Sequence, residues 1–186
     1  MKIIDLHQEE KNRIQQAVEN NRQAQQLIYS TYAPKMLSVC RQYVKDLHHA
    51  EDVMITAFMK VFTNIKHFEH KGSFEGWIRR IMINESISYI RANKKISFLE
   101  DELYIEESSN ATDSQFNVEE IQFLIDALPE GYKMVFNLYV IEGYKHQEIA
   151  KLLAIHEGTS KSQLAQARRI LQNEINTLKS LQNGTR

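Results

Sequence analysis

Apolar residues recur every three or four positions along most of this chain, a spacing that places them on one face of an α-helix. The pattern is clear where Phe74, Trp77, Ile78, Ile81 and Met82 follow it in order. Residues that form turns are scarce, with two Pro and six Gly in 186 residues. A sandwich or barrel of many short strands needs more turns than this. We therefore predict an all-α fold.

The positions of Pro, Gly and capping residues divide this pattern into separate helices. Pro34 and Pro129 are each expected to end one helix before the next begins, and Gly143 is expected to end another. Ser73 is expected to cap a helix that runs to about Asn93. The apolar stripes of other predicted helices span 24–31, 36–47, 53–65 and 121–128, and further helices are predicted over 130–142, over 146–153 and from about 158 to beyond 178.

Charge is segregated along a chain whose net charge is only −1. Residues 96–120 contain eight acidic and no basic residues, whereas basic residues are in excess on both sides. Two basic blocks separated by an acidic stretch rich in Ser and Asn indicate two domains and a linker, although one long solvated loop is the alternative. We expect the following division: an N-terminal extension (1–20), a first helical domain (21–95), an acidic linker (96–116) and a second helical domain (117–186).

The cellular compartment is suggested by what the sequence lacks. A single cysteine cannot form an internal disulfide, no apolar run has the length of a membrane span, and the charged start MKIIDLHQEEKNR does not resemble an export signal. We expect a cytoplasmic protein with no membrane insertion.

The chemistry expected of the chain is binding rather than catalysis. Cys40 lies on an apolar stripe and is expected to be a buried core thiol rather than a redox sensor. The histidine pairs His48-His49 and His67/His70 lack the spacing of a metal site. No phosphate-binding glycine loop, nucleophile elbow or carboxylate pair is evident. We expect no enzyme activity, no cofactor and no metal.

The most informative segment is a pair of helices at 146–153 and 158–178 joined by a tight turn. Small Ala150 is expected where the helices cross, with Ile155 at the corner, as in a helix-turn-helix. The second helix presents polar and basic side chains suited to phosphates and base edges, whereas a helical hairpin with a solvated basic face is the alternative. Those side chains are Lys161, Ser162, Gln163, Gln166, Arg168 and Arg169, outside a core stripe of Leu164, Ala167, Leu171 and Ile175.

Aromatic and basic residues interleave between Lys66 and Lys95. Rings that stack on unpaired bases, with cations for the backbone, are what single-stranded DNA requires. The alternative is that Phe74 and Trp77 are core residues beside a solvated basic face, and the spacing favours the core for Phe74.

These blocks resemble the sigma-seventy superfamily of bacterial RNA polymerase sigma factors. The resemblance rests on AEDVMITAFMKVFTNI (50–65), on FEHKGSFEGWIRRIMINESISYIRANKK (68–95) and on LPEGYKMVFNLYVIEGYKHQEIAKLLAIHEGTSKSQLAQARRIL (128–171). The short chain resembles the extracytoplasmic-function (ECF) group, which keeps only the second and fourth conserved regions. The resemblance spans about residues 20–175.

The resemblance implies that region 2 binds core polymerase and the minus-ten element. Helices within 36–62 would dock on the clamp helices of the largest subunit, with Asp52, Val53 and Phe58 in the contact. Ile55-Thr56 replaces a usual Gln-Glu pair there. The minus-ten element would be melted and a flipped base captured by the following residues: His70, Lys71, Gly72, Ser73, Trp77, Arg80 and Asn84.

The resemblance also implies that region 4 reads the minus-thirty-five element as duplex and contacts the flap of the second-largest subunit. Ala154 replaces a usual glycine, Ser160 a usual apolar residue and Gln163 a usual arginine. The acidic linker would run through the channels later used by nascent RNA, and an anti-sigma factor is an expected partner. The DNA-binding residues would be Lys161, Ser162, Ala165, Gln166, Arg168 and Arg169.

Two other classes of function stay open at this point. A stand-alone helix-turn-helix regulator would bind closed duplex tightly, with a steep dependence on salt, and would usually be a dimer. A helical adaptor would have no DNA role and would tolerate loss of Lys161 and Arg168.

Overall fold

A computed structural model of the protein describes the backbone of residues 2–93 and 118–183, and the side chains of residues 8–93 and 120–180. Every regular element within these ranges is helical, which confirms the all-α prediction. No helix in the described part of the chain is long and apolar enough to span a membrane.

The chain forms two compact units, residues 1–94 and 95–186. Two helical units confirm the fold expected from the charge pattern. The acidic linker, 96–116, lies outside the described residues, as does Asn117, where the second domain was expected to open.

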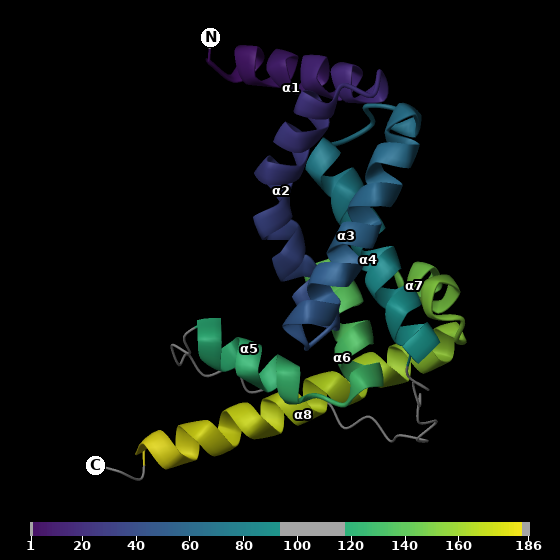
Figure 1. Cartoon of the computed structure of the whole chain (residues 1–186). Helices are drawn as coiled ribbons and strands as arrows, with labels where there is room; N and C mark the ends of the chain where they lie inside the picture. The colour runs from purple at the N-terminus through teal and green to yellow at the C-terminus, as the bar shows by residue number, and fades with distance from the viewer. Residues whose placement is uncertain (1, 94–117, 184–186) are drawn as a thin grey trace. The chain divides into compact units, whose positions relative to one another are not determined.

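Unit 1 is a bundle in which three helices pack against one another and a fourth crosses their end. Helices α2, α3 and α4 form the bundle, and α1 packs on α2 and η1 (Figure 1). Its elements are α1 (Lys2–Val18), α2 (Arg22–Tyr43), α3 (Leu47–Asn64), the short 3-10 turn η1 (Ile65–His67) and α4 (Phe74–Asn93).

The N-terminal extension is an ordered part of unit 1. Ile14 and Ala17 of α1 are buried, and the Tyr32 hydroxyl of α2 donates a hydrogen bond to the Glu10 carboxylate. The side chain of Asn21 accepts hydrogen bonds from two backbone N–H groups of α2, at 3.0 and 3.1 Å, which caps that helix. Helix α1 is therefore joined to the domain that follows it.

The prediction that Pro34 ends a helix is wrong. Helix α2 runs through Pro34 as one element of 22 residues. Proline inside a helix removes a hydrogen bond and typically costs about 3 kcal/mol. Ile28 before the proline and Met36 after it are both buried, while Pro34 itself faces solvent. Burial of the apolar face on both sides of Pro34 stabilises the helix by enough free energy to offset that cost.

Cys40 lies at the centre of unit 1, as predicted. Its side chain is fully buried, and its Sγ lies 3.9 Å from the Sδ of Met82. Burial raises the pKa of the Cys40 thiol to about 11. The thiol therefore stays protonated at neutral pH and acts as a small apolar core residue.

Unit 2 is built around its last and longest helix, on which α5, α6 and α7 all pack. A small apolar cluster centred on Leu128, Tyr132 and Ala167 joins α6 to α8. The segment predicted as one helix over 130–142 ends in a π-helical turn. Its elements are α5 (Val118–Ala127), α6 (Glu130–Phe136), the π turn η2 (Asn137–Ile141), α7 (His146–Leu153) and α8 (Glu157–Asn183).

The turn between α7 and α8 has the compact geometry expected of a helix-turn-helix. Ala154 caps α7 in the left-handed conformation, with φ 56° and ψ 47°. The N–H groups of Ala154 and Ile155 both donate to the carbonyl of Ala150. The left-handed conformation is one that glycine adopts freely and alanine does not, so Ala154 is strained where relatives were expected to have glycine.

Candidate nucleic-acid and protein interfaces

The loop that enters α4 has a fixed, turned backbone. His70 and Gly72 have positive φ angles of 57° and 100°, and Lys71 between them is exposed. The Ser73 Oγ accepts a hydrogen bond of 3.1 Å from the N–H of Gly76, which confirms Ser73 as the helix cap. The loop therefore presents a cation directly before the positive end of a helix dipole.

An aromatic cluster lies under this loop. The ring centroid of Phe68 is 4.7 Å from that of His70, 5.1 Å from that of Phe74 and 5.6 Å from that of Trp77. Phe74 is buried, which confirms the expectation that it is a core residue. Trp77 is only partly buried, so its ring is both supported from below and accessible at the surface.

The exposed side of α4 continues the surface that the loop begins. Trp77, Arg80 and Asn84 are spaced by three and four residues, so they lie along one side of the helix. Arg80 and Asn84 are exposed. We call this surface the loop–α4 face; it comprises His70, Lys71, Gly72, Ser73, Trp77, Arg80 and Asn84.

On α3, the structure corrects two of the three residues expected at a protein interface. Val53 and Phe58 are 3% and 2% exposed, and the Phe58 ring packs on Tyr29 with centroids 4.8 Å apart. Both belong to the core-facing stripe of α3, so they cannot touch a partner while the bundle is intact. Only Asp52 of the three is exposed.

The exposed apolar residues of α3 are ones that the sequence reasoning did not select. Ile55 is 49% exposed and Met59 is 67% exposed, and with Asp52 they follow helical spacing. Large apolar side chains held in water near one another are typical of a protein interface. We call Asp52, Ile55 and Met59 the α3 face. The sequence does contain a signal for the α3 face, because Ile55 stands where a polar residue was expected.

The second helix of the helix-turn-helix presents most of the expected basic surface. Lys161, Arg168 and Arg169 are exposed, and Ser162 and Ala165 are partly exposed. Lys161 Nζ lies 2.7 Å from the Glu157 carboxylate one turn earlier. We call this surface the α8 face; it comprises Lys161, Ser162, Ala165, Arg168 and Arg169.

Gln166 does not belong to the α8 face. It is 3% exposed, and its Nε2 has no hydrogen-bond partner among the residues described. Gln163, also expected at the surface, is buried. Three helices pack on α8, so the buried side of α8 is wider than the stripe that a single partner helix would cover. In this conformation the Gln166 side chain cannot reach a base edge.

A layered contact lies beside the α8 face. The rings of Tyr139 in η2 and His146 in α7 stack with centroids 4.5 Å apart and planes 23° apart. The Arg168 guanidinium carbon lies 5.8 Å from the centroid of the Tyr139 ring. His146 Nδ1 lies 2.9 Å from the buried Ser160 Oγ. Ser160, another departure from the resembled family, therefore has a hydrogen-bonding role.

The surroundings of His146 favour its neutral form. Desolvation lowers the pKa of His146 from its ordinary value, and the nearby positive charges of Lys161 and Arg168 lower it further against the opposing Glu157. A neutral imidazole can stack on Tyr139 and form a hydrogen bond with Ser160 without repelling the cations of α8.

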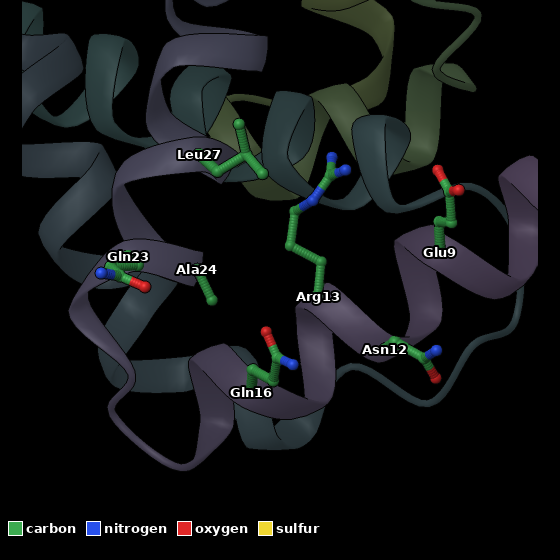
Figure 2. A pocket seen from close by; sticks show the side chains of 7 residues that line it. All are labelled: Glu9, Asn12, Arg13, Gln16, Gln23, Ala24 and Leu27. Atoms are coloured by element: carbon green, nitrogen blue, oxygen red, sulfur yellow. The ribbon is translucent and has the colours of Figure 1, made fainter.

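A polar groove separates α1 from α2 in unit 1. Figure 2 shows that Arg13 extends from α1 toward Leu27 of α2. Amide side chains make up much of the remaining wall, and the groove lies apart from the residues chosen from the sequence. Its lining residues are Glu9, Asn12, Arg13, Gln16, Gln23, Ala24 and Leu27. Over the described residues, no group of three or more potential ligands could hold a metal ion.

Comparisons with known proteins place both units in one family. Residues 28–96 match the model of sigma-70 region 2, and residues 118–171 match that of sigma-70 region 4. The chain is 28% identical over 182 residues to the ECF RNA polymerase sigma factor SigW of Bacillus subtilis, covering 90% of this chain and 97% of that protein. It is 27% identical over 180 residues to the ECF sigma-E factor of Haemophilus influenzae, covering 89% and 94%.

Two solved structures share the fold. The sigma factor RpoE of Bartonella quintana, in complex with the anti-sigma factor NepR, matches with a TM-score of 0.52 and 20% identity over 81% of this chain and 96% of that one. CnrH, in complex with the cytosolic domain of CnrY, matches with a TM-score of 0.51 and 17% identity over 90% and 97%.

The fold and the matched regions define a transcription initiation factor made of a helical bundle and a helix-turn-helix. The chain belongs to the sigma-70 family, in its ECF group, and directs transcription by RNA polymerase. This assignment favours the polymerase-dependent function over the stand-alone regulator and the adaptor considered from sequence.

Proposed function

We propose that unit 1 holds the minus-ten promoter element as an unpaired strand, while unit 2 reads the minus-thirty-five element as duplex, both on core RNA polymerase. The observation that carries this proposal is the loop–α4 face, where a supported but accessible Trp77 lies beside exposed cations and the Asn84 amide. The chain itself supplies no catalytic step and acts in the cytoplasm with the polymerase.

Capture of an unpaired base accounts for the chemistry of the loop–α4 face. Extruding a base from duplex DNA costs a few kcal/mol, and stacking on an aromatic ring returns about 1–3 kcal/mol per base. Trp77 offers such a ring, and its packing on Phe68 fixes it before DNA arrives. Asn84 both donates and accepts hydrogen bonds, so its amide suits a base edge. Lys71 and Arg80 would hold the backbone.

Core polymerase would bind at the α3 face. Asp52 is exposed on α3 beside Ile55 and Met59, and these apolar side chains gain free energy when a partner covers them. A clamp helix of the largest subunit is the partner that the family implies. Val53 and Phe58 would support the interface from inside the bundle.

Unit 2 would place the α8 face in the major groove. Arg168 and Arg169 would meet phosphates, and Lys161 would reach a base edge near the start of the helix. The same unit would contact the flap of the second-largest polymerase subunit. The acidic linker, 96–116, would lie where nascent RNA later runs, so charge repulsion would help RNA displace it.

An anti-sigma factor is a further proposed partner. Of the two solved structures that share the fold, RpoE is in complex with the anti-sigma factor NepR, and CnrH is in complex with the cytosolic domain of CnrY. By covering the α3 face or the α8 face, a partner of this kind would prevent polymerase or promoter binding.

The test is transcription from fragmented genomic DNA of the source organism by its sigma-free core polymerase, with and without this protein. Sequencing the RNA ends should reveal discrete new starts that share two upstream elements. The control is a variant with the α3 face altered, Met59→Glu, which should give far fewer new starts at the same protein concentration. Protein that is folded yet neither binds core nor produces starts would contradict the proposal.

A further inference from the structure

The layered contact beside the α8 face joins three separate elements of unit 2. Tyr139 comes from η2, His146 is the first residue of α7, and Arg168 lies on the exposed side of α8. A π turn is uncommon and often marks a functional position, and here it carries the central ring of the stack. The contact therefore links the turn before the helix-turn-helix to the surface proposed to meet DNA.

The His146 ring of the stack is itself held in place. The Tyr139 ring contacts both partners: its centroid lies 4.5 Å from that of the His146 ring and 5.8 Å from the Arg168 guanidinium carbon. His146 is in turn held by Ser160, whose hydroxyl is fully buried at 2.9 Å from Nδ1. With His146 fixed on α8 itself through Ser160, the Tyr139 ring has a rigid backing.

The physical effect of this arrangement falls on Arg168. An exposed arginine samples many rotamers, and fixing it on a phosphate costs conformational entropy. A cation within about 6 Å of an aromatic centroid is attracted to the ring face, by about 0.5–1 kcal/mol at exposed sites. The guanidinium keeps its N–H donors while it lies over the ring, so it can still bind phosphate.

We propose that Tyr139 and His146 are positioning residues for promoter recognition, whose stacked rings hold the Arg168 guanidinium in place to meet a DNA phosphate. This inference rests on the proposed function of the α8 face as a duplex-binding surface. It adds that Ser160, where the family usually has an apolar residue, belongs to the same device.

The test uses holoenzyme assembled from the full chain and core polymerase, titrated with a short labelled duplex that carries the upstream element found by mapping starts. Tyr139→Leu should weaken binding roughly two- to five-fold. Tyr139→Phe keeps the ring and should bind as the unmodified protein does. His146→Leu should weaken binding in the same direction, because the Tyr139 ring loses its backing.

A double-mutant cycle separates positioning from a general loss of structure. Once Arg168→Ala has removed the guanidinium, Tyr139→Leu should cause no further loss. Arg169→Ala is the matched control, since it removes a neighbouring cation outside the stack; in that background Tyr139→Leu should again cost two- to five-fold. If Tyr139→Leu impairs folding by circular dichroism, Tyr139→Met replaces it in the cycle.

The possible failures differ from one another. If Tyr139→Leu acts equally in the Arg168→Ala and Arg169→Ala backgrounds, or if Tyr139→Phe binds as poorly as Tyr139→Leu, the positioning role is overturned while the α8 face stands. If the unmodified holoenzyme shows no affinity for the upstream element, or if Arg168→Ala changes nothing, the proposed role of the α8 face fails and the inference falls with it.

Discussion

Asn84 and Trp77 differ in burial and in the size of the effect that their loss should have on promoter opening. Asn84 is exposed, so Asn84→Ala should leave stability within about 0.5 kcal/mol. We expect it to reduce promoter opening roughly two- to ten-fold through lost hydrogen bonds. Trp77→Ala should reduce opening more, because base stacking is worth about 1–3 kcal/mol. Permanganate reactivity of unpaired thymines in the holoenzyme–promoter complex measures both effects.

The control for this pair is Ser88→Ala, one turn beyond Asn84 on the same side of α4. It should open promoters as the unmodified protein does. All three variants should bind core polymerase with nearly unchanged affinity. Loss of core binding by folded Trp77→Ala and Asn84→Ala proteins would show that the loop–α4 face has been assigned the wrong partner.

Cys40 allows a direct measure of how rarely unit 1 opens. It is the only cysteine in the chain, it is fully buried, and its thiol pKa is raised to about 11. Because the thiolate is the reactive form, we expect Ellman's reagent at pH 8 to modify native protein at least ~100-fold more slowly than denatured protein. An added surface thiol, Asn93→Cys in a Cys40→Ala background, should react at once. Rapid modification of native Cys40 would instead support a redox role.

The resemblance implies that Gln166 contacts DNA, whereas the structure buries its side chain. The buried Gln166 Nε2 has no hydrogen-bond partner among the described residues, and such an unpaired donor costs about 1–3 kcal/mol. Gln166→Met keeps the volume and removes the amide, so it should raise the free energy of unfolding of unit 2 by about 1 kcal/mol, as measured by hydrogen exchange in α8. Promoter affinity should change less than two-fold. A tenfold loss of affinity would restore Gln166 to the DNA-binding set.

At the scale of elements, the turn of the helix-turn-helix carries a strain that can be relieved. Ala154 adopts a left-handed conformation that costs a non-glycine residue about 1–2 kcal/mol. Glycine would remove this strain, but part of the gain is offset because glycine makes the unfolded chain more flexible. Ala154→Gly should therefore stabilise unit 2 by about 1 kcal/mol, measured by hydrogen exchange in α7 and α8. Ala150→Gly, inside α7, should destabilise it by about the same amount. Equal destabilisation by both changes would contradict this account of the turn.

Helix positions were predictable from sequence where the apolar spacing was regular. The bounds of α7 were predicted to the residue, and Ser73 was identified as the cap of α4, because both signals are local. Pro34 does not end its helix as predicted, because its local cost is offset by burial on both sides, which depends on partners distant in sequence. The π turn of η2 left no local signal.

The candidate interfaces were predictable only in part, for a similar reason. The resemblance placed Val53 and Phe58 at an interface, although both fit the apolar spacing of the predicted helix 53–65, and burial decided for the core. Periodicity alone had already favoured that outcome. Gln166 could not be judged from spacing, since the width of the buried side of α8 depends on how many helices pack on it.

At the scale of the whole molecule, the three faces divide initiation into steps that can fail separately. The loop–α4 face and the α3 face lie on different helices of unit 1, and the α8 face lies on unit 2. Polymerase binding, duplex recognition and strand capture are thereby assigned to surfaces that share no residue. A sigma factor whose net charge is −1 lacks the strong positive charge that drives nonspecific DNA binding, so we expect its DNA affinity to depend on assembly with polymerase.

The α3 face tests this division most directly. Met59 is 67% exposed, so Met59→Glu should leave the stability of unit 1 nearly unchanged while placing a charge in the proposed contact. We expect the affinity for core polymerase to fall roughly ten- to a hundred-fold, the equivalent of losing a buried methionine. Asn64→Glu is the control: it adds the same charge on α3, about 140° around the helix from Met59, and should bind core normally. Core binding that survives Met59→Glu but is lost with Asn64→Glu would place the polymerase on another side of α3, and the division of surfaces would have to be redrawn from there.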